Sequence, residues 1–369
     1  MLPLKDPSLL KTQSLIDNQW TDATTGDTID VTNPFDNQVI ATIPSLEKSQ
    51  VIDAVAIAHK AQIDWAQKTA NERAAILNNW ADLIDQNKED LATIMTAEQG
   101  KPLTESRGEI GYANSFIRWF AEEGKRIYGD IIPSTNKDLR YVVLKQPIGV
   151  CAAITPWNFP AAMITRKVAP ALAAGCSIIV KPATETPLTA LALGELAIRA
   201  GLPAGLLQIV TGKSSVIGEV LTQDERIHKL SFTGSTEVGR VLMAQCASTV
   251  KKLSMELGGN APFIVFDDAD LEKAASGLIA SKYRNAGQTC VCANRVYVQA
   301  SIKDKFLAIF KQKVEALKVG NGMTEGVNIG PLINQDALDK VEQLLEDAVN
   351  KGATMVTGGK KHAASALSF

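Results

Sequence analysis

The sequence predicts an α/β fold built around a parallel sheet, because short apolar runs alternate with helical segments from Pro147 onward. Strands that alternate with helices form a parallel sheet whose two faces are both covered. The composition supports this class, since 46% of the 369 residues are hydrophobic and 21% are charged. A chain of this length has room for two domains. The expected strands are 150–154, 177–180, 206–210 and 230–232, and the expected helices are 160–174, 188–200, 216–221 and one from Thr236.

A helical segment is expected before this alternating section, over residues 46–125. Asn71 is a candidate cap for a helix whose apolar residues fall on one stripe, and Gly100 and Pro102 are stop signals. Two β-rich runs around a polar turn predict a hairpin arm over residues 128–146. After Leu257 the pattern predicts a second α/β section, with strands at 263–266 and 295–298 and helices at 271–284 and 302–317.

Charge and residue usage exclude several classes of protein. The formal net charge is −2, so no strong positive field would attract nucleic acid or an anionic membrane. No apolar run is long enough to span a membrane, and residues 1–10 lack the pattern of a signal peptide. Five cysteines, an odd number, predict a reducing cytoplasmic location rather than a disulfide framework. Three histidines argue against a histidine-ligated metal centre, and we expect no metal.

Cys290 is the candidate nucleophile. It ends the loop Asn285-Ala286-Gly287-Gln288-Thr289-Cys290, and a thiolate attacks well where positive charge or backbone amides stabilise it. Taken alone, a cysteine is more often an inert buried residue. Glu256 ends an expected short strand and is the candidate general base, because histidines are scarce. Burial there would raise the pKa of Glu256 toward neutrality, and the alternative is a surface glutamate.

Two further loops follow strands of the alternating section. Asn158, in Thr155-Pro156-Trp157-Asn158, could donate its amide to a developing oxyanion or could cap a helix. Lys181 ends the second strand, where a dinucleotide-binding fold contacts the adenosine ribose. Residues 232–239 open a helix whose N-terminus favours a phosphate. No G-x-G-x-x-G motif is present, and helix capping alone would explain a Gly-Ser-Thr opening.

Together these segments resemble the aldehyde dehydrogenase superfamily over roughly residues 12–362. The resemblance is carried, in the family's order, by Pro156-Trp157-Asn158, Phe232-Thr233-Gly234-Ser235, Glu256-Leu257-Gly258-Gly259 and Gly287-Gln288-Thr289-Cys290. It implies a Rossmann-type cofactor domain at 1–127 and 147–256, a β-hairpin oligomerisation arm at 128–146 and a partial α/β catalytic domain at 257–369. Family members continue past residue 369, so it also implies a C-terminally truncated chain.

The resemblance implies a mechanism in which Cys290 attacks an aldehyde to form a thiohemiacetal. Asn158 and the Cys290 amide would hold the oxyanion, and Glu256 would activate the water that hydrolyses the later thioester. Lys181 would hold the adenosine ribose and Ser235 the pyrophosphate of NAD or NADP. The residues expected at the cofactor are Thr155, Pro156, Trp157, Lys181, Thr184, Gly234, Ser235 and Gly239.

Within the superfamily the chain is most similar to succinate-semialdehyde dehydrogenases, which serve 4-aminobutyrate degradation. Arg166 and Arg284 match the arginines that bind the substrate carboxylate there. Two guanidiniums near the nucleophile would also suit a small anionic aldehyde on physical grounds. A structural ion pair is the alternative for each arginine. Glutarate semialdehyde stays open as the substrate, because one methylene discriminates weakly.

Thr184 decides the expected cofactor preference. Many NAD-selective relatives carry a glutamate there, which repels a 2′-phosphate, whereas threonine is neutral and lies close to Lys181 in the sequence. We therefore expect NADP to be accepted and to be the candidate for the preferred cofactor. Glu185 taking over the role of that glutamate is the alternative. Cys290 and Cys292 form a candidate reversible redox pair, and a bystander Cys292 is the alternative.

Truncation raises two hypotheses from other functional classes. The chain could be an inactive remnant that only binds dinucleotide, because the section 147–256 is complete. It could also be a thiol redox sensor built on Cys290 and Cys292. Family members are homo-oligomers, but a tetramer is not expected for a chain without the C-terminal partner strand of the arm. A small-molecule aldehyde is the expected partner, and neither nucleic acid nor membrane is.

Overall fold

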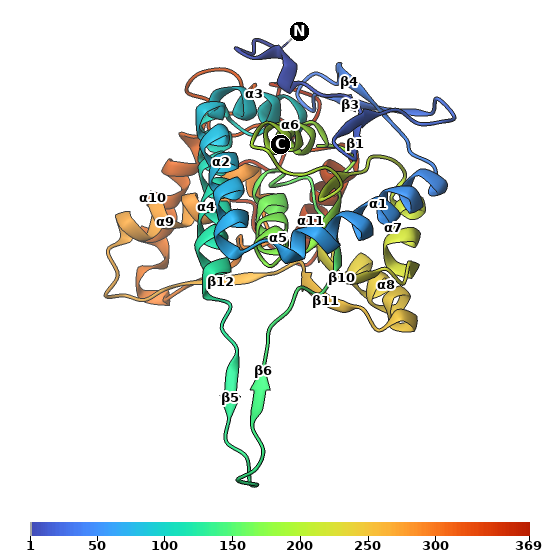
Figure 1. Cartoon of the computed structure of the whole chain (residues 1–369). Coiled ribbons are helices and arrows are strands. Elements are labelled where there is room, and N and C mark those ends of the chain that lie inside the picture. The colour runs from blue at the N-terminus through green and yellow to red at the C-terminus, as the bar shows by residue number, and fades with distance from the viewer. Residues whose placement is uncertain (1) are drawn as a thin grey trace.

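A seven-stranded, mostly parallel sheet organises the protein, as the computed structural model of residues 2–369 shows (Figure 1). The strand order is β11-β10-β7-β8-β9-β1-β2. The predicted parallel sheet is confirmed. Its parallel strands are β7 (Val150–Ile154), β8 (Ser177–Lys181), β9 (Leu207–Ile209), β10 (Ile227–Thr233) and β11 (Lys252–Glu256), and the antiparallel strands β1 (Ser14–Ile16) and β2 (Gln19–Thr21) extend one edge.

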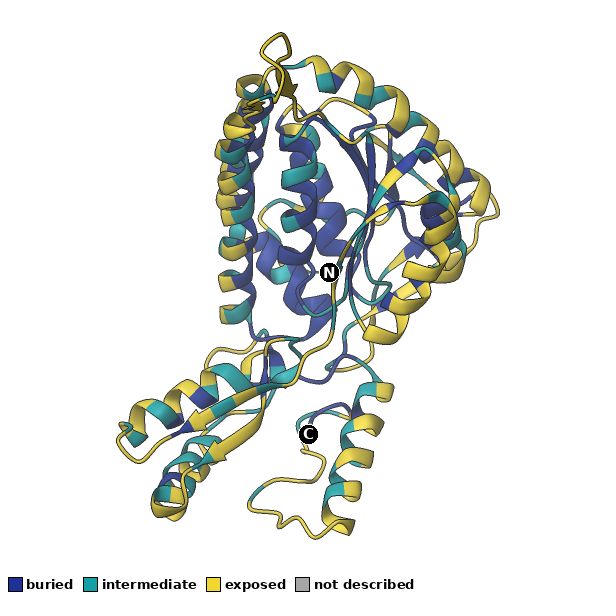
Figure 2. Cartoon of the chain, turned by 90° about the horizontal axis from the view of Figure 1, so that it is seen from below, coloured by how far each residue is buried: buried dark blue, intermediate teal, exposed yellow. Residues whose placement is uncertain are grey.

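Helices cover both faces of this sheet, as expected for strands joined by helical crossovers (Figure 2). One face carries α1 (Lys48–Gln67), α7 (Ser214–Gln223) and α8 (Thr236–Cys246). The other carries α2 (Ala70–Gln86), α3 (Lys88–Gln99), α4 (Leu103–Glu123), α5 (Ala162–Ala173) and α6 (Leu188–Arg199). Strand β7 shows why both faces must be covered, since Cys151 and Ala153 join one core cluster while Val150 and Ala152 join the other.

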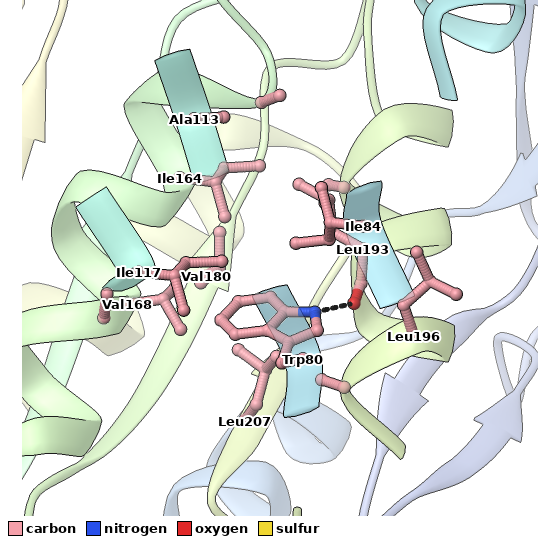
Figure 3. Packing of buried hydrophobic residues seen from close by; sticks show 14 of the residues in the cluster. Trp80, Ile84, Ala113, Ile117, Ile164, Val168, Val180, Leu193, Leu196 and Leu207 are labelled. Atoms are coloured by element: carbon pink, nitrogen blue, oxygen red, sulfur yellow. Dashed lines mark hydrogen bonds between the residues drawn. The ribbon is translucent and has the colours of Figure 1, made fainter. Parts of the chain in front are cut away.

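Trp80 of α2 lies in the larger of these cores (Figure 3). Its side chain is 1% exposed, and its indole Nε1 donates to the carbonyl oxygen of Leu193 at 3.0 Å. A buried tryptophan needs such a partner, because an unpaired indole N–H in an apolar core is costly. Leu196 of α6 and Leu207 of β9 belong to the same cluster, so Trp80 connects the helix layer to the sheet.

The predicted helical segment 46–125 is four helices, and its predicted cap is wrong. Thr69 caps α2, because its hydroxyl accepts from the Glu72 amide at 3.3 Å while Glu72 Oε2 accepts from the Thr69 amide at 2.7 Å. This reciprocal capping box places Asn71 inside the helix instead. Gly100 does end α3, in the left-handed conformation at φ 90°, and Pro102 directly precedes α4.

The predicted hairpin arm is present as β5 (Asp130–Ile132) and β6 (Tyr141–Val143), which pair antiparallel. It projects away from the body of the molecule (Figure 1). All six strand residues are exposed, including Ile131 at 76% and Val142 at 62%. An apolar strand pair this exposed is typical of a surface that another chain covers.

The last third of the chain forms a smaller α/β region. Strands β12 (Ala261–Val265) and β13 (Ala293–Val298) pair in parallel, and α9 (Leu271–Lys282) and α10 (Lys303–Glu315) pack with them. The pattern had predicted these four elements but not α11 (Gln335–Asn350), nor the hairpin of β3 (Thr28–Thr32) and β4 (Val39–Pro44) near the N-terminus. The short 3-10 helices are η1 (Pro7–Leu9), η2 (Gly124–Arg126), η3 (Ala247–Thr249), η4 (Arg284–Gly287) and η5 (Ala300–Ile302). Among residues 2–369, no helix is long and apolar enough to cross a membrane.

Candidate active site

The register of the sheet brings the carboxyl ends of its parallel strands, which carry several predicted site residues, to the same edge. Ile154 pairs with Lys181 across β7 and β8, and Thr233 pairs with Glu256 across β10 and β11. Strands that run parallel therefore end together, and the loops that follow them meet at their carboxyl ends. This edge opens on a cavity of about 1030 Å³. Six of the predicted residues line it, namely Pro156, Trp157, Asn158, Gly234, Ser235 and Cys290. The other eight, Thr155, Arg166, Lys181, Thr184, Gly239, Glu256, Arg284 and Cys292, are not among its lining residues.

The loop that leads to Cys290 has an unusual backbone. Asn285, Ala286 and Gly287 follow one another with φ values of 53°, 55° and 77°. Left-handed conformations cost a residue with a Cβ about 1–2 kcal/mol, so only Gly287 adopts its angle freely. Strain of this kind persists where surrounding contacts hold the chain, and it is common at functional sites.

Asn285 supplies those contacts. Its side chain is buried, with Oδ1 accepting from Gln99 Nε2 at 2.9 Å and Nδ2 donating to the Asn158 carbonyl oxygen at 3.0 Å. Its backbone amide donates to Glu105 Oε2 at 2.9 Å. Burial raises the pKa of Glu105. The loop is thus held by residues of α3 and α4, which are distant in sequence.

Asn158 faces the same loop. Its amide Nδ2 donates to the Gln288 carbonyl oxygen at 2.9 Å, which fixes the plane of the side-chain amide. A primary amide has two N–H groups, so the second remains to donate into the cavity that Asn158 and Cys290 both line. The alternative of a helix cap at Asn158 is wrong, because the N-cap residue of α5 is Ala161.

Gly259 allows the loop after Glu256 to pack against the loop that contains Cys290. A Cβ on Gly259 would lie 2.7 Å from the carbonyl oxygen of Cys290, so only glycine allows this approach. Glu256 ends β11, and its carbonyl oxygen accepts from the Gly234 amide at 3.1 Å. Its side chain is exposed, so the expectation that Glu256 is buried is wrong. The loop is short enough that the residue after the strand, Leu257, already lines the cavity.

Lys181 is a buried cation with few partners. It is 3% exposed, and its Nζ has one long contact, 3.4 Å to Thr184 Oγ1. Burial lowers the pKa of Lys181 to about 8, against a smaller opposing effect of Glu185. Thr155 lies beside it, since its amide donates to the Lys181 carbonyl oxygen at 3.1 Å. The buried Thr155 hydroxyl has no hydrogen-bond partner among residues 2–369.

The start of α8 lies at the same cavity, which Gly234 and Ser235 line. Ser235 caps this helix, and its Oγ accepts from the Val238 amide at 3.2 Å. A Cβ on Gly234 would lie 2.4 Å from the Phe232 ring, so the helix entry requires glycine. A Cβ on Gly239 would lie 2.6 Å from Leu257, which shows that Gly239 serves the packing of α8 on the next loop. The glycine at 234, the amides at the helix start, the Lys181 cation with its single long contact and the unpartnered Thr155 hydroxyl all suit a dinucleotide.

Arg166 and Arg284 are held by aromatic rings rather than by carboxylates. Neither forms a salt bridge within residues 2–369, so the ion-pair alternative is wrong for both. The Arg284 guanidinium lies 5.1 Å from the Phe159 ring centre. The Arg166 guanidinium lies 4.7 Å from the Phe116 ring centre and donates to the Tyr112 hydroxyl at 2.9 Å.

Cys290 and Cys292 are both free thiols with different surroundings. Cys290 is partly exposed, while Cys292 is 0% exposed. The Cys292 sulfur lies 2.8 Å from Thr289 Oγ1 and donates to the Gly287 carbonyl oxygen at 3.3 Å. A disulfide would have to replace these contacts, and the redox pair stays a prediction.

Some polar residues at the site were not predicted from the sequence. Lys167 is buried and donates to Thr233 Oγ1 at 2.7 Å, and burial lowers the pKa of Lys167 to about 8. Lys101 and Glu109 form a buried ion pair beside Asn158. Lys101 lies between the helix stop signals Gly100 and Pro102, so the sequence pattern predicted a helix end there and gave no sign of a functional lysine.

Comparisons with known proteins agree with this arrangement. The family model described as "Aldehyde dehydrogenase family" matches residues 20–367. The NADP-dependent succinate-semialdehyde dehydrogenase of Escherichia coli K12 is 57% identical over 361 residues, covering 98% of this chain and 75% of that protein. A glutarate-semialdehyde dehydrogenase of Pseudomonas putida KT2440 is also 57% identical, covering 97% and 75%. The crystal structure of an aldehyde dehydrogenase from Brucella melitensis biovar abortus 2308 superposes with a TM-score of 0.98 at 62% identity, covering 100% of this chain and 76% of that one.

Proposed function

We propose that this chain, which belongs to the aldehyde dehydrogenase family, whose members oxidise aldehydes, acts on a short aldehyde that carries a carboxylate. The proposed reaction is the oxidation of succinate semialdehyde to succinate. The observation that carries the proposal is the pair of guanidiniums at Arg166 and Arg284. Neither guanidinium forms a salt bridge within residues 2–369, and each packs against an aromatic ring instead. Arg166 also contacts the sulfur of Met163 at 3.7 Å, and Met163 lines the Cys290 cavity.

Cys290 acts as the nucleophile in this proposal. Its thiolate adds to the aldehyde carbon, and the carbonyl oxygen takes the negative charge of the resulting thiohemiacetal. The free N–H of Asn158 and the backbone amide of Cys290 donate to that oxygen. Because Gln288 holds the other Asn158 N–H, the donor is oriented before the charge develops.

The cofactor is NADP or NAD, and we propose that Lys181, Thr184 and Ser235 hold it. When bound, the dinucleotide supplies the two-electron acceptor that converts the thiohemiacetal into a thioester. Lys181 offers donors to the adenosine ribose, while its charge favours a 2′-phosphate. Thr184 adds no negative charge beside it. We therefore propose that NADP is preferred, with Pro156, Trp157, Thr155, Gly234 and Gly239 shaping the site.

Glu256 is proposed as the base that activates water against the thioester. Water adds to the thioester carbon, the C–S bond breaks, and the products are the acid and the Cys290 thiol. The loop that follows β11 approaches the Cys290 backbone at Gly259, and this proximity supports the proposed role of Glu256. Its Gln variant should therefore keep a burst of reduced cofactor in the first turnover and lose the steady-state rate. Equal loss of burst and steady-state rate would contradict this role.

We further propose how the parts of the chain divide this work. Residues 1–127 and 147–256 form the cofactor-binding part, 257–369 carry the nucleophile, and 128–146 form an arm for association with another copy of the chain. The exposed apolar strands of the arm support this last assignment. Sedimentation should report an oligomer that Ile131→Asp and Val142→Asp together dissociate, whereas a monomeric wild-type chain would contradict it.

Substitution of the arginines tests the substrate assignment. Arg284→Ala should lower kcat/KM for succinate semialdehyde on the order of 100-fold, because a charge-assisted hydrogen bond is lost, but change kcat/KM for butanal little. Arg166→Ala should have the same effect. Arg118→Ala, which removes the two exposed ion pairs of Arg118 with Asp82 and Asp85, is the matched control. Equal losses on both aldehydes would sink the proposal.

The wild-type chain provides two further measurements. Its kcat/KM for succinate semialdehyde should exceed that for glutarate semialdehyde, within the 10–200-fold that one methylene typically commands. The reverse order would make glutarate semialdehyde the substrate. A thermal shift with NADP but no turnover would instead identify a dinucleotide-binding chain without activity, and Cys290→Ala should abolish turnover while keeping that shift.

A further inference from the structure

Lys101 and Glu109 form a buried ion pair directly behind the site. Their side chains are 1% and 2% exposed, and Lys101 Nζ lies 2.5 Å from Glu109 Oε2. Two charges withdrawn from water recover the desolvation cost only when further hydrogen bonds satisfy them. Such a pair contributes little net free energy to folding, so we looked for a role in positioning the groups that it contacts.

Lys101 holds the backbone of the oxyanion donor. Its Nζ donates to the Asn158 carbonyl oxygen at 2.7 Å and lies 4.3 Å from the ring centre of Phe159. The same carbonyl oxygen accepts from Asn285 Nδ2 at 3.0 Å. Asn158 is thus bound at its backbone by two buried donors and at its side chain by Gln288.

Glu109 holds the other end of the same segment. Its Oε1 accepts from the backbone amides of Ala161 at 2.9 Å and Ala162 at 3.2 Å. These amides stand at the start of α5, where a negative charge is favoured by the unpaired N–H groups of the helix. The ion pair therefore clamps residues 158–162 between the carbonyl oxygen of Asn158 and the first amides of α5.

We propose that Lys101, held by Glu109, is the positioning residue that aims the Asn158 amide at the oxyanion. This inference rests on the proposed roles of Cys290 and Asn158. Lys101 does not line the cavity and touches no reacting atom, so it acts through Asn158. Loss of an oxyanion donor typically costs about 100–1000-fold in kcat, and a misaimed donor costs part of that.

A double-mutant cycle tests the coupling. Lys101→Met, which keeps a flexible unbranched side chain but removes the charge and the Nζ donor, should lower kcat about 10–100-fold while KM changes less than about threefold. In an Asn158→Ala background the same substitution should change kcat less than about threefold, because no amide is left to aim. Arg107→Met is the matched control, since Arg107 lies on α4, the helix of Glu109, but pairs with Glu89 at the exposed surface. It should leave kcat unchanged.

A cofactor-free reaction separates this inference from the substrate assignment. The Cys290 thiolate attacks 4-nitrophenyl acetate, a C–S bond forms, and the C–O bond to 4-nitrophenolate breaks with the electron pair leaving on that product. The acylation burst needs the oxyanion donor but neither NADP nor the arginines. Lys101→Met should slow it by the same factor as kcat. A burst without aldehyde oxidation would refute the proposed substrate and leave the Lys101 test intact.

Two outcomes overturn the inference. One is an equal slowing by Lys101→Met with and without Asn158, which would mean that Lys101 supports the fold alone. The other is a wild-type chain without any acylation burst, which would refute Cys290 and Lys101 together. If Lys101→Met does not unfold cooperatively, Glu109→Gln replaces it, because its remaining carbonyl oxygen can still accept from the α5 amides. The same loss of effect in the Asn158→Ala background is then expected, and an additive effect overturns the proposal.

Discussion

Residues 2–256, the dense region, bury many more side chains per helix than residues 257–369, the thin region. In the first region α6 buries nine residues, whereas α10 buries only Phe306 and α11 only Leu338 in the second. The contrast is visible in Figure 2, where the helices beside the large sheet are dark on their inner sides and the smaller region is mostly exposed or intermediate. A thin core gives little cooperative stability of its own.

The thin region nevertheless carries Cys290, and the dense region positions it. The strained turn at Asn285 is held by Gln99, Glu105 and Asn158, all of which belong to the dense region. Precise placement of the proposed nucleophile therefore does not require a rigid local core. It requires directional contacts to a rigid neighbour, and the cost of strain in the loop is offset there.

The largest expected effect tests the density difference directly. Trp80→Ala should cost about 3–5 kcal/mol, because it removes a fully buried ring and a hydrogen bond, and it should lower the midpoint of global unfolding in urea. Phe306→Ala should cost about 2–3 kcal/mol, since its sparse surroundings can relax, and should act on the second region alone.

Limited proteolysis distinguishes the two. Cleavage within 257–369 should rise sharply in Phe306→Ala while the fragment of the first region persists. If both variants shift the same single transition by the same amount, the two regions unfold as one unit and the comparison fails.

The next effect concerns a carboxyl group buried in the dense region. Burial raises the pKa of Glu98 from 4.5 to about 8, while its oxygens accept from the Leu188 and Thr189 amides at 2.6 and 2.8 Å. Between these pKa values the folded protein retains a proton that the unfolded chain has lost. The free energy of unfolding should therefore fall as pH rises from about 4.5 to about 8.

Glu98→Gln should flatten that slope, as measured by thermal unfolding at several pH values. Glu272→Gln, at an exposed position of α9 in the thin region, is the matched control and should leave the slope unchanged. A wild-type protein that becomes more stable over this window would refute the assignment.

Two helix caps give a matched pair at a smaller scale. Thr69 caps α2 in the dense region, and Asn334 caps α11 in the thin region by accepting from the Ala337 amide at 3.0 Å. Each alanine substitution should cost about 1 kcal/mol. Denaturant unfolding should register the loss for Thr69→Ala, while hydrogen exchange in α11 should register it for Asn334→Ala. Slower exchange in α11 of that variant would count against the capping role.

The smallest effect is expected on the exposed face of β12. Ile264 is 56% exposed, so Ile264→Thr should change the free energy of unfolding by no more than about 0.5 kcal/mol and keep the strand propensity. Urea unfolding checks this value. A loss of several kcal/mol would show that another chain or segment covers this face in solution.

Local patterns predicted most of the fold near the site. The apolar runs at 150–154 and 177–180 became β7 and β8 because strands buried on both faces must be apolar throughout. The cap of α2 was misassigned to Asn71, since Thr69 with Glu72 forms a reciprocal pair two residues earlier. The strands from β1 to β4 and helix α11 were not predicted. Helix α11 was nevertheless recognisable, because Leu338, Val341, Leu345 and Ala348 recur at helical spacing.

The sequence by itself determined which chemical groups the site can use. The thiol of Cys290, the amide of Asn158 and the cation of Lys181 follow from residue types and from their positions after strands, because a parallel sheet brings the ends of its strands together. Tertiary structure alone decided that Glu256 is exposed and that Lys101 pairs with Glu109 behind Asn158. Burial and long-range pairing depend on which distant segments meet, and no local periodicity encodes that.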